Sequence, residues 1–438
     1  MPELELPSGW LCVKLQDITS KPQYGYTTKA SETGEVKFLR TTDITKPYLD
    51  WSRVPYCLEE PENVSKYQIS QNDILISRAG SVGFSCLIDE PPEDTVFASY
   101  LIRFKPAEGI HPRYLKRFLE SEGYWQQIRD RSAGNAVQNV NAKKLADLDI
   151  PLAPSSEQTR IANKLDELLA QVDTIKARVD AIPGILKRFR QSVLAAAVSG
   201  RLTEEWRKNG NIEFDWPEVE FSTLIEKLRS GSGDKPTAEE DGVAILRSSA
   251  VRNMEVDYND IRYLDRALPP KAENYLESGD LLFTRLSGSA EYVGNCARVT
   301  SIGDLRIQYP DRLFCAKLVE VRYSPYLEIY FSSNRFRRHI SGQLKSSAGH
   351  QRITLDAIRK ASVVIPSLEE QSEIVRKVSM LFELAEQVEG RASDASQRTN
   401  NLTQSILAKA FRGELVPQNP DDEPASDLLG RIQGGRDG

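Results

Sequence analysis

The chain carries the same helix ending twice. Residues 191–202 read QSVLAAAVSGRL and residues 404–415 read QSILAKAFRGEL, 213 positions later, with seven of the twelve positions identical. At the same offset Glu157–Leu202 aligns with Glu370–Leu415 without a gap and keeps 13 of 46 identities. Unrelated sequences share roughly a twentieth to a tenth of their positions at typical residue usage. The chain therefore contains an internal repeat, and each copy of the repeat includes this helix.

The segments before each copy also correspond. FLRTTDI (38–44) matches ILRSSAV (245–251), and NDILISRAGSVG (72–83) matches GDLLFTRLSGSAEYVG (279–294). We therefore predict alternating globular and helical regions: a first globular domain at 1–150, a central helical region at 151–207, a second globular domain at 208–365, a distal helical region at 366–416, and a Pro/Asp-rich tail at 417–438 that is disordered.

Each globular domain is predicted to be α+β. Short segments rich in strand-forming residues and bounded by turn residues indicate strands: VKFLR (36–40), DILIS (73–77), VAILR (243–247), DLLFTR (280–285) and ASVVIP (361–366). Residues 113–130 and 325–344 are predicted to form one helix near the end of each domain.

The helical regions carry a coiled-coil pattern. Apolar residues follow spacings of four and three from Ile161 to Ala196, and the second copy keeps this frame from Ile374 to Ile406. A 3.5-residue period predicts a coiled-coil seam. The predicted seam residues are Ile161, Leu165, Leu168, Val172, Ile175, Phe189, Ile374, Val378, Leu381, Val388, Leu402 and Ile406.

The helix ends have sequence signals. Ser155-x-x-Gln158 and Ser367-x-x-Glu370 are capping-box patterns at the starts. Gly200 and Gly413 stand where a glycine typically ends a helix. Pro183-Gly184 predicts a kink or a short break in the first helix.

The composition gives little sign of a partner. The 438 residues carry a net charge of -6, and no run approaches the 18 apolar residues of a membrane span, so we expect a cytoplasmic protein. Five scattered cysteines without a C-x-x-C pair favour reduced thiols. A basic domain, the usual electrostatic sign of nucleic-acid binding, is absent.

Motifs for catalysis are also missing from the sequence. It has no P-loop and no G-x-G-x-x-G that opens a helix, and its three histidines have neither metal-ligand nor nucleophile spacing. We expect a binding protein with no catalytic residue and no metal site. The alternative that the chain is an enzyme in its own right finds no support, because the sequence has no cofactor or metal pattern. A scaffold whose two domains bind proteins remains open.

The strongest binding signal lies at residues 334–352, which contain five basic side chains, two histidines and no acid. Such a segment suits phosphate contacts with polar groups left for base edges, although basic residues that only favour solubility would also explain it. Arg40 and Arg247 occupy matching places in the two copies, as do Arg78 and Arg285, and each could instead form a structural salt bridge.

The loops at 20–29 and 229–242 occupy equivalent positions in the two copies but have little sequence in common. Two different binding specificities would require such a difference, but the ordinary sequence divergence of loops explains it equally well. The candidate DNA-binding residues are Lys21, Tyr24, Tyr26, Arg40, Arg78, Ser81, Asn135, Gln138, Asn139, Lys235, Arg247, Arg252, Arg285, Ser287, Ser289, Arg337, Arg338, Lys345, His350, Gln351 and Arg352.

Over nearly its whole length the chain resembles the specificity subunits of Type I restriction–modification enzymes. IPLAPSSEQTRIANKLDELL (150–169) and IPSLEEQSEIVRKV (365–378) carry the resemblance, together with the two helix endings quoted above. LLAQVDTIKARVDAIPGILKRFRQ (168–191) resembles the enterobacterial group.

The resemblance implies two target-recognition domains separated by two long antiparallel helices. Each domain would read one half of a split, asymmetric site in double-stranded DNA. Two modification subunits would dock and bring S-adenosylmethionine, and restriction subunits would join with ATP and magnesium, so this chain would hold no cofactor itself. Repeated residues expected to be exposed are candidates for contacts with these partners: Gln158, Gln191, Ser192, Gln371, Gln404 and Ser405.

Overall fold

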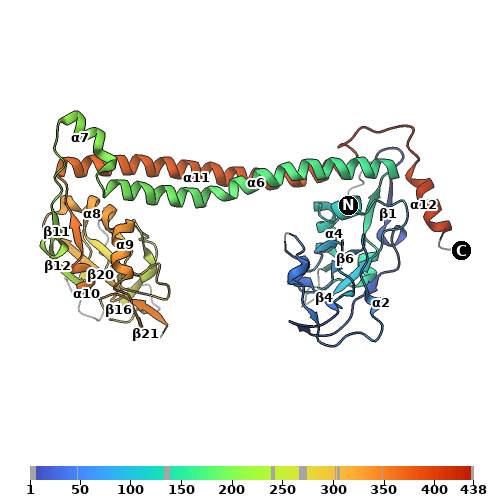
Figure 1. The fold of residues 1–438 in the computed structure, drawn as a ribbon, viewed down its shortest axis with the longest axis horizontal. Helices are drawn as coiled ribbons and strands as arrows, with labels where there is room; N and C mark the ends of the chain where they lie inside the picture. The colour runs from blue at the N-terminus through green and yellow to red at the C-terminus, as the bar shows by residue number, and fades with distance from the viewer. Residues whose placement is uncertain are drawn as a thin grey trace. The chain divides into compact units, whose positions relative to one another are not determined.

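The structure is a computed structural model that describes residues 6–46, 48–132, 139–237, 242–265, 274–300, 302, 306–347 and 349–435. It divides into two compact units, Met1–Asp180 with Asp394–Gly438, and Ala181–Ser393. Each unit joins one globular domain to parts of two long helices, α6 (Ser155–Ala197) and α11 (Leu368–Phe411) (Figure 1). Within the described ranges no helix has both the length and the apolar character needed to cross a membrane.

The two long helices run antiparallel. In the first unit Ile161, near the start of α6, shares a core with Ala410, near the end of α11. In the second unit Val193, near the end of α6, shares a core with Val378, near the start of α11. Because each helix is continuous, these two pairings fix opposite directions. The antiparallel pairing implied by the family resemblance is confirmed.

The predicted seam is confirmed near the helix ends and wrong in places elsewhere. The seam residues found buried are Ile161, Leu165, Val172, Ile374 and Val378, and those found half-buried are Leu168, Phe189, Leu381, Val388 and Ile406.

Two predicted seam residues, Ile175 and Leu402, are instead 48% and 47% exposed. Beside the half-buried Leu168 and Ile406, Leu169 and Leu407 are fully or nearly fully buried. A straight α-helix drifts by about 20° per heptad from a 3.5-residue repeat. The buried stripe therefore moves to a neighbouring residue, which the heptad count does not anticipate.

The first predicted capping box is wrong. Helix α6 begins at Ser155 itself, whose hydroxyl donates to the Gly109 carbonyl at 2.8 Å. At the second helix, the Glu370 amide donates to the Ser367 hydroxyl at 3.3 Å, as predicted, but the Glu370 side chain has other partners.

The glycine endings are confirmed, since Gly200 and Gly413 have φ of 77° and 74°. These are left-handed values that favour glycine. Helix α6 continues through Pro183, so no break occurs there.

The first domain is built on two four-stranded sheets and one two-stranded sheet, with strand orders β2-β9-β6-β7, β3-β5-β4-β8 and β1-β10. Its strands are β1 (Leu11–Lys14), β2 (Gln23–Tyr24), β3 (Ala30–Ser31), β4 (Lys37–Leu39), β5 (Tyr56–Cys57), β6 (Ile74–Ser77), β7 (Ser85–Leu87), β8 (Thr95–Phe97), β9 (Leu101–Phe104) and β10 (Asp149–Leu152). Its helices are α1 (Thr41–Ile44), α2 (Val64–Tyr67), α3 (Pro112–Phe118), α4 (Glu122–Ser132) and α5 (Ala142–Ala146).

The second domain has a matching four-stranded sheet, β12-β20-β17-β19, and a matching pair, β11-β23. Its strands are β11 (Glu218–Glu220), β12 (Ile225–Ser230), β13 (Gly242–Leu246), β14 (Val251–Arg252), β15 (Glu255–Val256), β16 (Ile261–Asp265), β17 (Leu281–Thr284), β18 (Leu286–Ser287), β19 (Cys296–Arg298), β20 (Leu313–Leu318), β21 (Lys345–Ser347), β22 (His350–Arg352) and β23 (Ser362–Val364). Its helices are α8 (Ser324–Phe331), α9 (Asn334–Ser341) and α10 (Leu355–Arg359), and α7 (Glu204–Gly210) precedes the domain.

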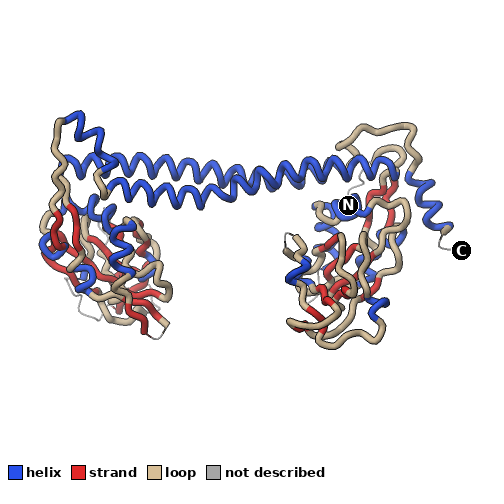
Figure 2. The backbone as a smooth tube through the Cα atoms, in the orientation of Figure 1, coloured by secondary structure: helices blue, strands red, loops and turns tan. Residues whose placement is uncertain are grey.

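The five predicted strands are confirmed as β4, β6, β13, β17 and β23. Each predicted late helix is in fact a pair, α3 with α4 and α8 with α9, because the chain turns between them at Leu119–Ser121 and at Ser332–Ser333. Figure 2 shows the strands of each unit gathered in one body beside its helices. The α+β class is therefore confirmed.

A buried glutamate joins each domain to the helices. Glu157, 1% exposed, accepts from the Trp10 indole at 2.9 Å and from the Gln418 amide at 2.6 Å. Burial raises the pKa of Glu157, and the hydrogen bonds from Trp10 and Gln418 oppose that rise. We call Glu157, Trp10 and Gln418 the first node.

The second node repeats this arrangement 213 residues later. Glu370, 3% exposed, accepts from the Trp216 indole at 2.9 Å and from the Thr203 hydroxyl at 2.6 Å, and it forms an ion pair with Arg207. Arg207 also donates to the Gly200 carbonyl at 2.7 Å. Each node therefore links the start of one long helix, the end of the other and the first strand region of a domain.

The predicted disorder of the tail is wrong for residues 417–435. Helix α12 (Ala425–Gly434) packs on the first domain, with Ala425, Leu428 and Ile432 in its core. Before α12, Asp422 forms an ion pair with Arg160 at 2.6 Å. Three apolar residues on one helix face provide the burial that the tail's average composition conceals.

We expect Glu370→Gln to destabilise the second unit by about 3–5 kcal/mol, because Arg207 would remain buried without a counter-charge. The measurement is the urea-unfolding free energy. Glu373→Gln is the control, since its partner Arg376 has a side chain that is 60% exposed. Equal effects of the two variants would contradict a dominant role for the node.

Leu428→Ala should destabilise the first unit by about 2–5 kcal/mol, because it leaves a cavity beneath α12. Hydrogen exchange over residues 425–434 would report the loss directly. Gln433→Ala changes an exposed position of the same helix and should leave exchange unaltered. Rapid exchange of this segment in the unmutated chain would contradict the docked helix.

Candidate nucleic-acid interface

In the first domain three predicted contacts meet at the end of β6. Arg78 follows this strand, and its guanidinium lies 4.9 Å from the centre of the Tyr24 ring. Its Nε atom is buried and has no hydrogen-bond partner among the described residues. A bridge between Ala79 and Asn139 brings Asn139 to the same place. Three separate chain segments thus converge around one cation.

The other predicted contacts of this domain lie elsewhere or have structural partners. Arg40 forms a two-point ion pair with the buried Asp43, so it serves the structural salt bridge that the sequence left open. Tyr26 packs against Tyr67, with ring centres 5.4 Å apart, and Lys21 is exposed. Ser81 follows Arg78 in the loop, and Asn135 and Gln138 lie outside the described residues.

The second domain has a larger assembly at the matching place. The Ile353 amide donates to the Arg285 carbonyl at 3.1 Å, as the Val140 amide donates to the Arg78 carbonyl at 3.0 Å. Beyond this anchor the chain forms the three-stranded sheet β18-β22-β21. That sheet brings together five predicted contacts: Ser287, Lys345, His350, Gln351 and Arg352.

Arg285 itself is partly committed within the chain. Its guanidinium donates to the Asp311 carbonyl at 3.0 Å and lies 5.6 Å from the centre of the Phe314 ring. Arg252 lies 4.9 Å from the centre of the Tyr292 ring, and Ser289 precedes Tyr292 in the same loop. Tyr292 is 41% exposed, so this stacked pair is open to a ligand.

A basic groove of about 420 Å³ adds residues that the sequence did not single out. Lys235 and Arg247, both predicted contacts, line it together with Arg262 and Arg312. Arg247 is paired with Asp260 at 3.4 Å, while Arg262 and Arg312 are exposed. Arg262 lies at an exposed position of β16. Only the fold, which brings this strand beside the loop at 310–312, shows that Arg262 lines the groove.

Arg337 is a structural residue rather than a surface cation. It donates to the Val293 carbonyl and to the Asn295 side chain, and burial lowers the pKa of its guanidinium. Its assignment as a DNA contact is therefore not supported by its geometry. Its neighbour Arg338 is exposed and stays available.

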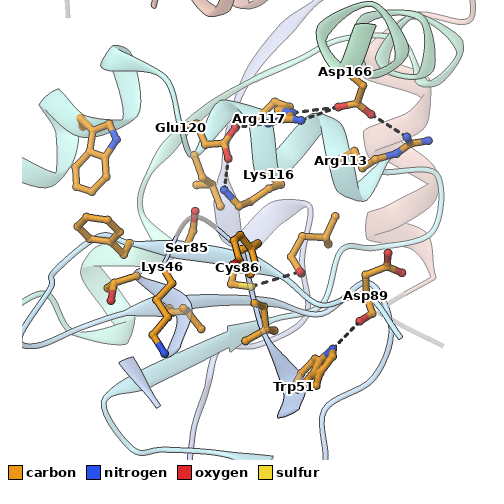
Figure 3. A pocket seen from close by; sticks show the side chains of 18 residues that line it. Lys46, Trp51, Ser85, Cys86, Asp89, Arg113, Lys116, Arg117, Glu120 and Asp166 are labelled. Carbon is orange, nitrogen blue, oxygen red and sulfur yellow. Dashed lines mark hydrogen bonds and ion pairs between the residues drawn. The ribbon is translucent and has the colours of Figure 1, made fainter. Parts of the chain in front are cut away.

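A groove of the first domain, about 880 Å³, is lined by none of the predicted DNA contacts. Three of its cations are paired: Arg113 and Arg117 reach Asp166 on α6, and Lys116 reaches Glu120 (Figure 3). The fourth, Lys46, is exposed. Burial raises the pKa of Cys86 to about 11, so its thiol stays protonated and is a poor nucleophile at neutral pH. Within the described ranges no cluster of His, Cys, Asp and Glu could hold a metal.

Comparison with known proteins decides the family. The model for the Type I restriction modification DNA specificity domain matches residues 7–183. The Type I restriction enzyme EcoKI specificity subunit of Escherichia coli K12 is 36% identical, with 99% of this chain and 96% of that relative covered. This chain belongs to the family of Type I restriction enzyme specificity subunits.

Other members support this membership. The StySPI specificity subunit of Salmonella potsdam is 32% identical over 99% of this chain and 96% of its own length. Among solved structures, the HsdS subunit from Thermoanaerobacter tengcongensis has the same fold, with a TM-score of 0.54 at 18% identity and with 94% of this chain and 99% of that chain covered. A chain from a study of complex assembly and conformational transition of the type I R-M system gives a TM-score of 0.64 at 16% identity, with 94% and 100% covered.

The specificity subunit is the sequence-reading member of such an enzyme and not a catalytic one. Of the residues proposed to meet its partners, Gln158 and Gln371 are buried, contrary to expectation. Each donates to a backbone carbonyl five residues earlier, Ala153 and Pro366, at 2.8 Å.

The remaining four candidates for partner contacts are exposed: Gln191, Ser192, Gln404 and Ser405. They form two matching pairs, one near the end of α6 and one near the end of α11.

We expect Arg337→Ala to lower the stability of the second unit by about 1–3 kcal/mol, because two buried acceptors lose their donor. Arg338→Ala, on the next position of the same helix, should leave stability unchanged. Thermal unfolding of both variants checks this. Native stability of Arg337→Ala together with weakened DNA binding would restore the original assignment.

Proposed function

We propose that this specificity subunit reads a split, asymmetric site in double-stranded DNA, one half with each globular domain. Two modification subunits dock on the helix pair, and restriction subunits join the assembly. S-adenosylmethionine, ATP and magnesium belong to those partners, which work where the DNA is, in the cytoplasm. The chain supplies the choice of sequence and the partners supply the chemistry.

The observation that carries this proposal is one framework with two different surfaces. The anchors at Arg78 and Arg285 have the same backbone hydrogen bond and follow matching strands. Around Arg78 lie Tyr24 and Asn139, whereas around Arg285 lies a sheet that bears Gln351 and Arg352. Arginine and glutamine side chains read base edges in the major groove through paired hydrogen bonds. Different donors on one framework suit two different half-sites.

The net charge of the subunit fits DNA binding together with its partner subunits rather than by the subunit alone. Its net charge is -6, and several of its arginines are paired with carboxylates inside the chain. Non-specific affinity depends on the number of phosphates neutralised by free cations. The lone chain should therefore bind DNA weakly, and the assembly with modification subunits should bind strongly.

The helix pair suits the docking of two similar partners. Gln191 with Ser192, and Gln404 with Ser405, are exposed pairs related by the 213-residue repeat. Because the same two residue types recur at the same helix position in each copy, one kind of partner could use both. This supports two modification subunits rather than one.

The test starts by sequencing methylated DNA from cells that express the subunit with its modification subunit, which should yield two half-sites separated by a spacer. Arg262→Ala with Arg312→Ala should then weaken DNA binding by the assembly and lower the salt slope by about one unit per lost phosphate contact.

Glu226→Ala, an exposed acidic change in the same domain, serves as the control. Loss of affinity should leave the sequence of both half-sites unchanged if these arginines meet phosphates. An assembly without sequence-dependent binding would contradict the proposal and favour a protein-binding scaffold.

A further inference from the structure

Helix α12 covers a defined surface of the first domain. Beneath it the Ala107 amide donates to the Ile18 carbonyl at 2.9 Å, and Gly109 follows two residues later. Gly109 has a φ of 86°, which favours glycine, and a Cβ atom there would lie 2.6 Å from the Cδ1 atom of Leu428. Ile18 is 1% exposed and belongs to the same core as Leu428.

The second domain has the same surface without a cover. There the Val319 amide donates to the Leu224 carbonyl at 3.0 Å, which identifies Val319 with Ala107 and Leu224 with Ile18. Val321 takes the place of Gly109. Val319 is 68% exposed, Val321 is 53% exposed, and Leu224 is half-buried. We call Leu224, Val319 and Val321 the valine surface.

The residues that hold α12 in the first unit are replaced by residues of opposite character in the second. Asp422, ahead of α12, is bound by Arg160 and by Ser156. At an offset of 213 these two positions are Glu373, which is paired with Arg376 and Lys377, and the exposed Glu369. A segment that leads into a helix on the valine surface would therefore meet the exposed Glu369 and find no counterpart of Arg160, so it should be basic rather than acidic.

The start and the face of the expected helix can also be described. The Ala425 amide donates to the Gly9 carbonyl, and the position that matches Gly9 is the exposed Asp215. A carboxylate favours a helix N-terminus. Val321 adds a side chain where the first domain has a glycine, so we expect the docked helix to carry a residue smaller than Leu428 at this point.

From these observations we propose that the valine surface binds a short amphipathic helix of a modification subunit, preceded by basic residues. This inference rests on the proposed function, which supplies the partner. The α12 of a second copy does not fit, because Leu428 would meet Val321 and Asp422 would meet Glu369 in place of Arg160. The two modification subunits therefore dock unequally, since α12 occupies the matching surface of the first domain.

A photo-crosslinking amino acid, p-benzoylphenylalanine, placed at Val319 in the full assembly tests the contact. Illumination should join the subunit to a modification subunit, and peptide mapping should find a helix that follows basic residues. The same probe at Leu58, 58% exposed in the first domain, is the control and should give no such product. Attachment to a restriction subunit, to a second copy or to nothing would overturn the inference.

A second measurement uses Val319→Glu with Val321→Glu, which change exposed side chains and should leave folding intact. The affinity for the second modification subunit should fall on the order of tenfold or more, as for central residues of an interface. Native mass spectrometry should show assemblies with one modification subunit.

Unchanged stoichiometry and affinity in this variant would overturn the inference. If the unmutated assembly still binds a two-part DNA site in that case, the proposed function stands alone. Failure of the unmutated assembly to bind any specific DNA would instead remove the proposed function, whatever the crosslink shows.

Discussion

The buried glutamates of the two nodes are the constraint on which the rest of the structure depends. A carboxylate removed from water is costly unless hydrogen bonds or a counter-charge compensate it. Glu157 and Glu370 obtain this compensation from segments that lie far apart in the chain, a tryptophan at the start of a domain and a residue just past the end of the opposite helix. Each node is complete only when the two long helices run antiparallel and the domain is seated at their junction.

The two nodes achieve the same result with different partners. Gln418 binds Glu157 through an amide, whereas Arg207 binds Glu370 through a full charge and also closes the end of α6 at Gly200. Both copies keep a node with a buried glutamate but use different partners for its carboxylate. After its node, one copy continues into the second domain and the other into α12. The repeat is therefore symmetrical at its joints and unsymmetrical at its surfaces.

The arginines of the chain fall into two groups, those paired within the chain and those exposed to a ligand. Arg40 and Arg337 look like binding residues in the sequence, but their guanidinium groups are used within the chain. Arg262 and Arg312 stand on exposed surface beside a groove and were not singled out. A cation binds phosphate well only if its own protein has not already neutralised it, so partners rather than residue types decide the interface.

The sequence by itself determined the repeat, the two long helices, the α+β class and the family, because these depend on local periodicity and on residues repeated at a fixed offset. It predicted five strands and both glycine helix ends for the same reason. Tertiary structure alone decided that Ile175 is exposed, that Gln158 and Gln371 are buried, and that residues 425–434 form a docked helix. In these cases the outcome depends on which distant segment lies against the residue, and no local pattern carries that information.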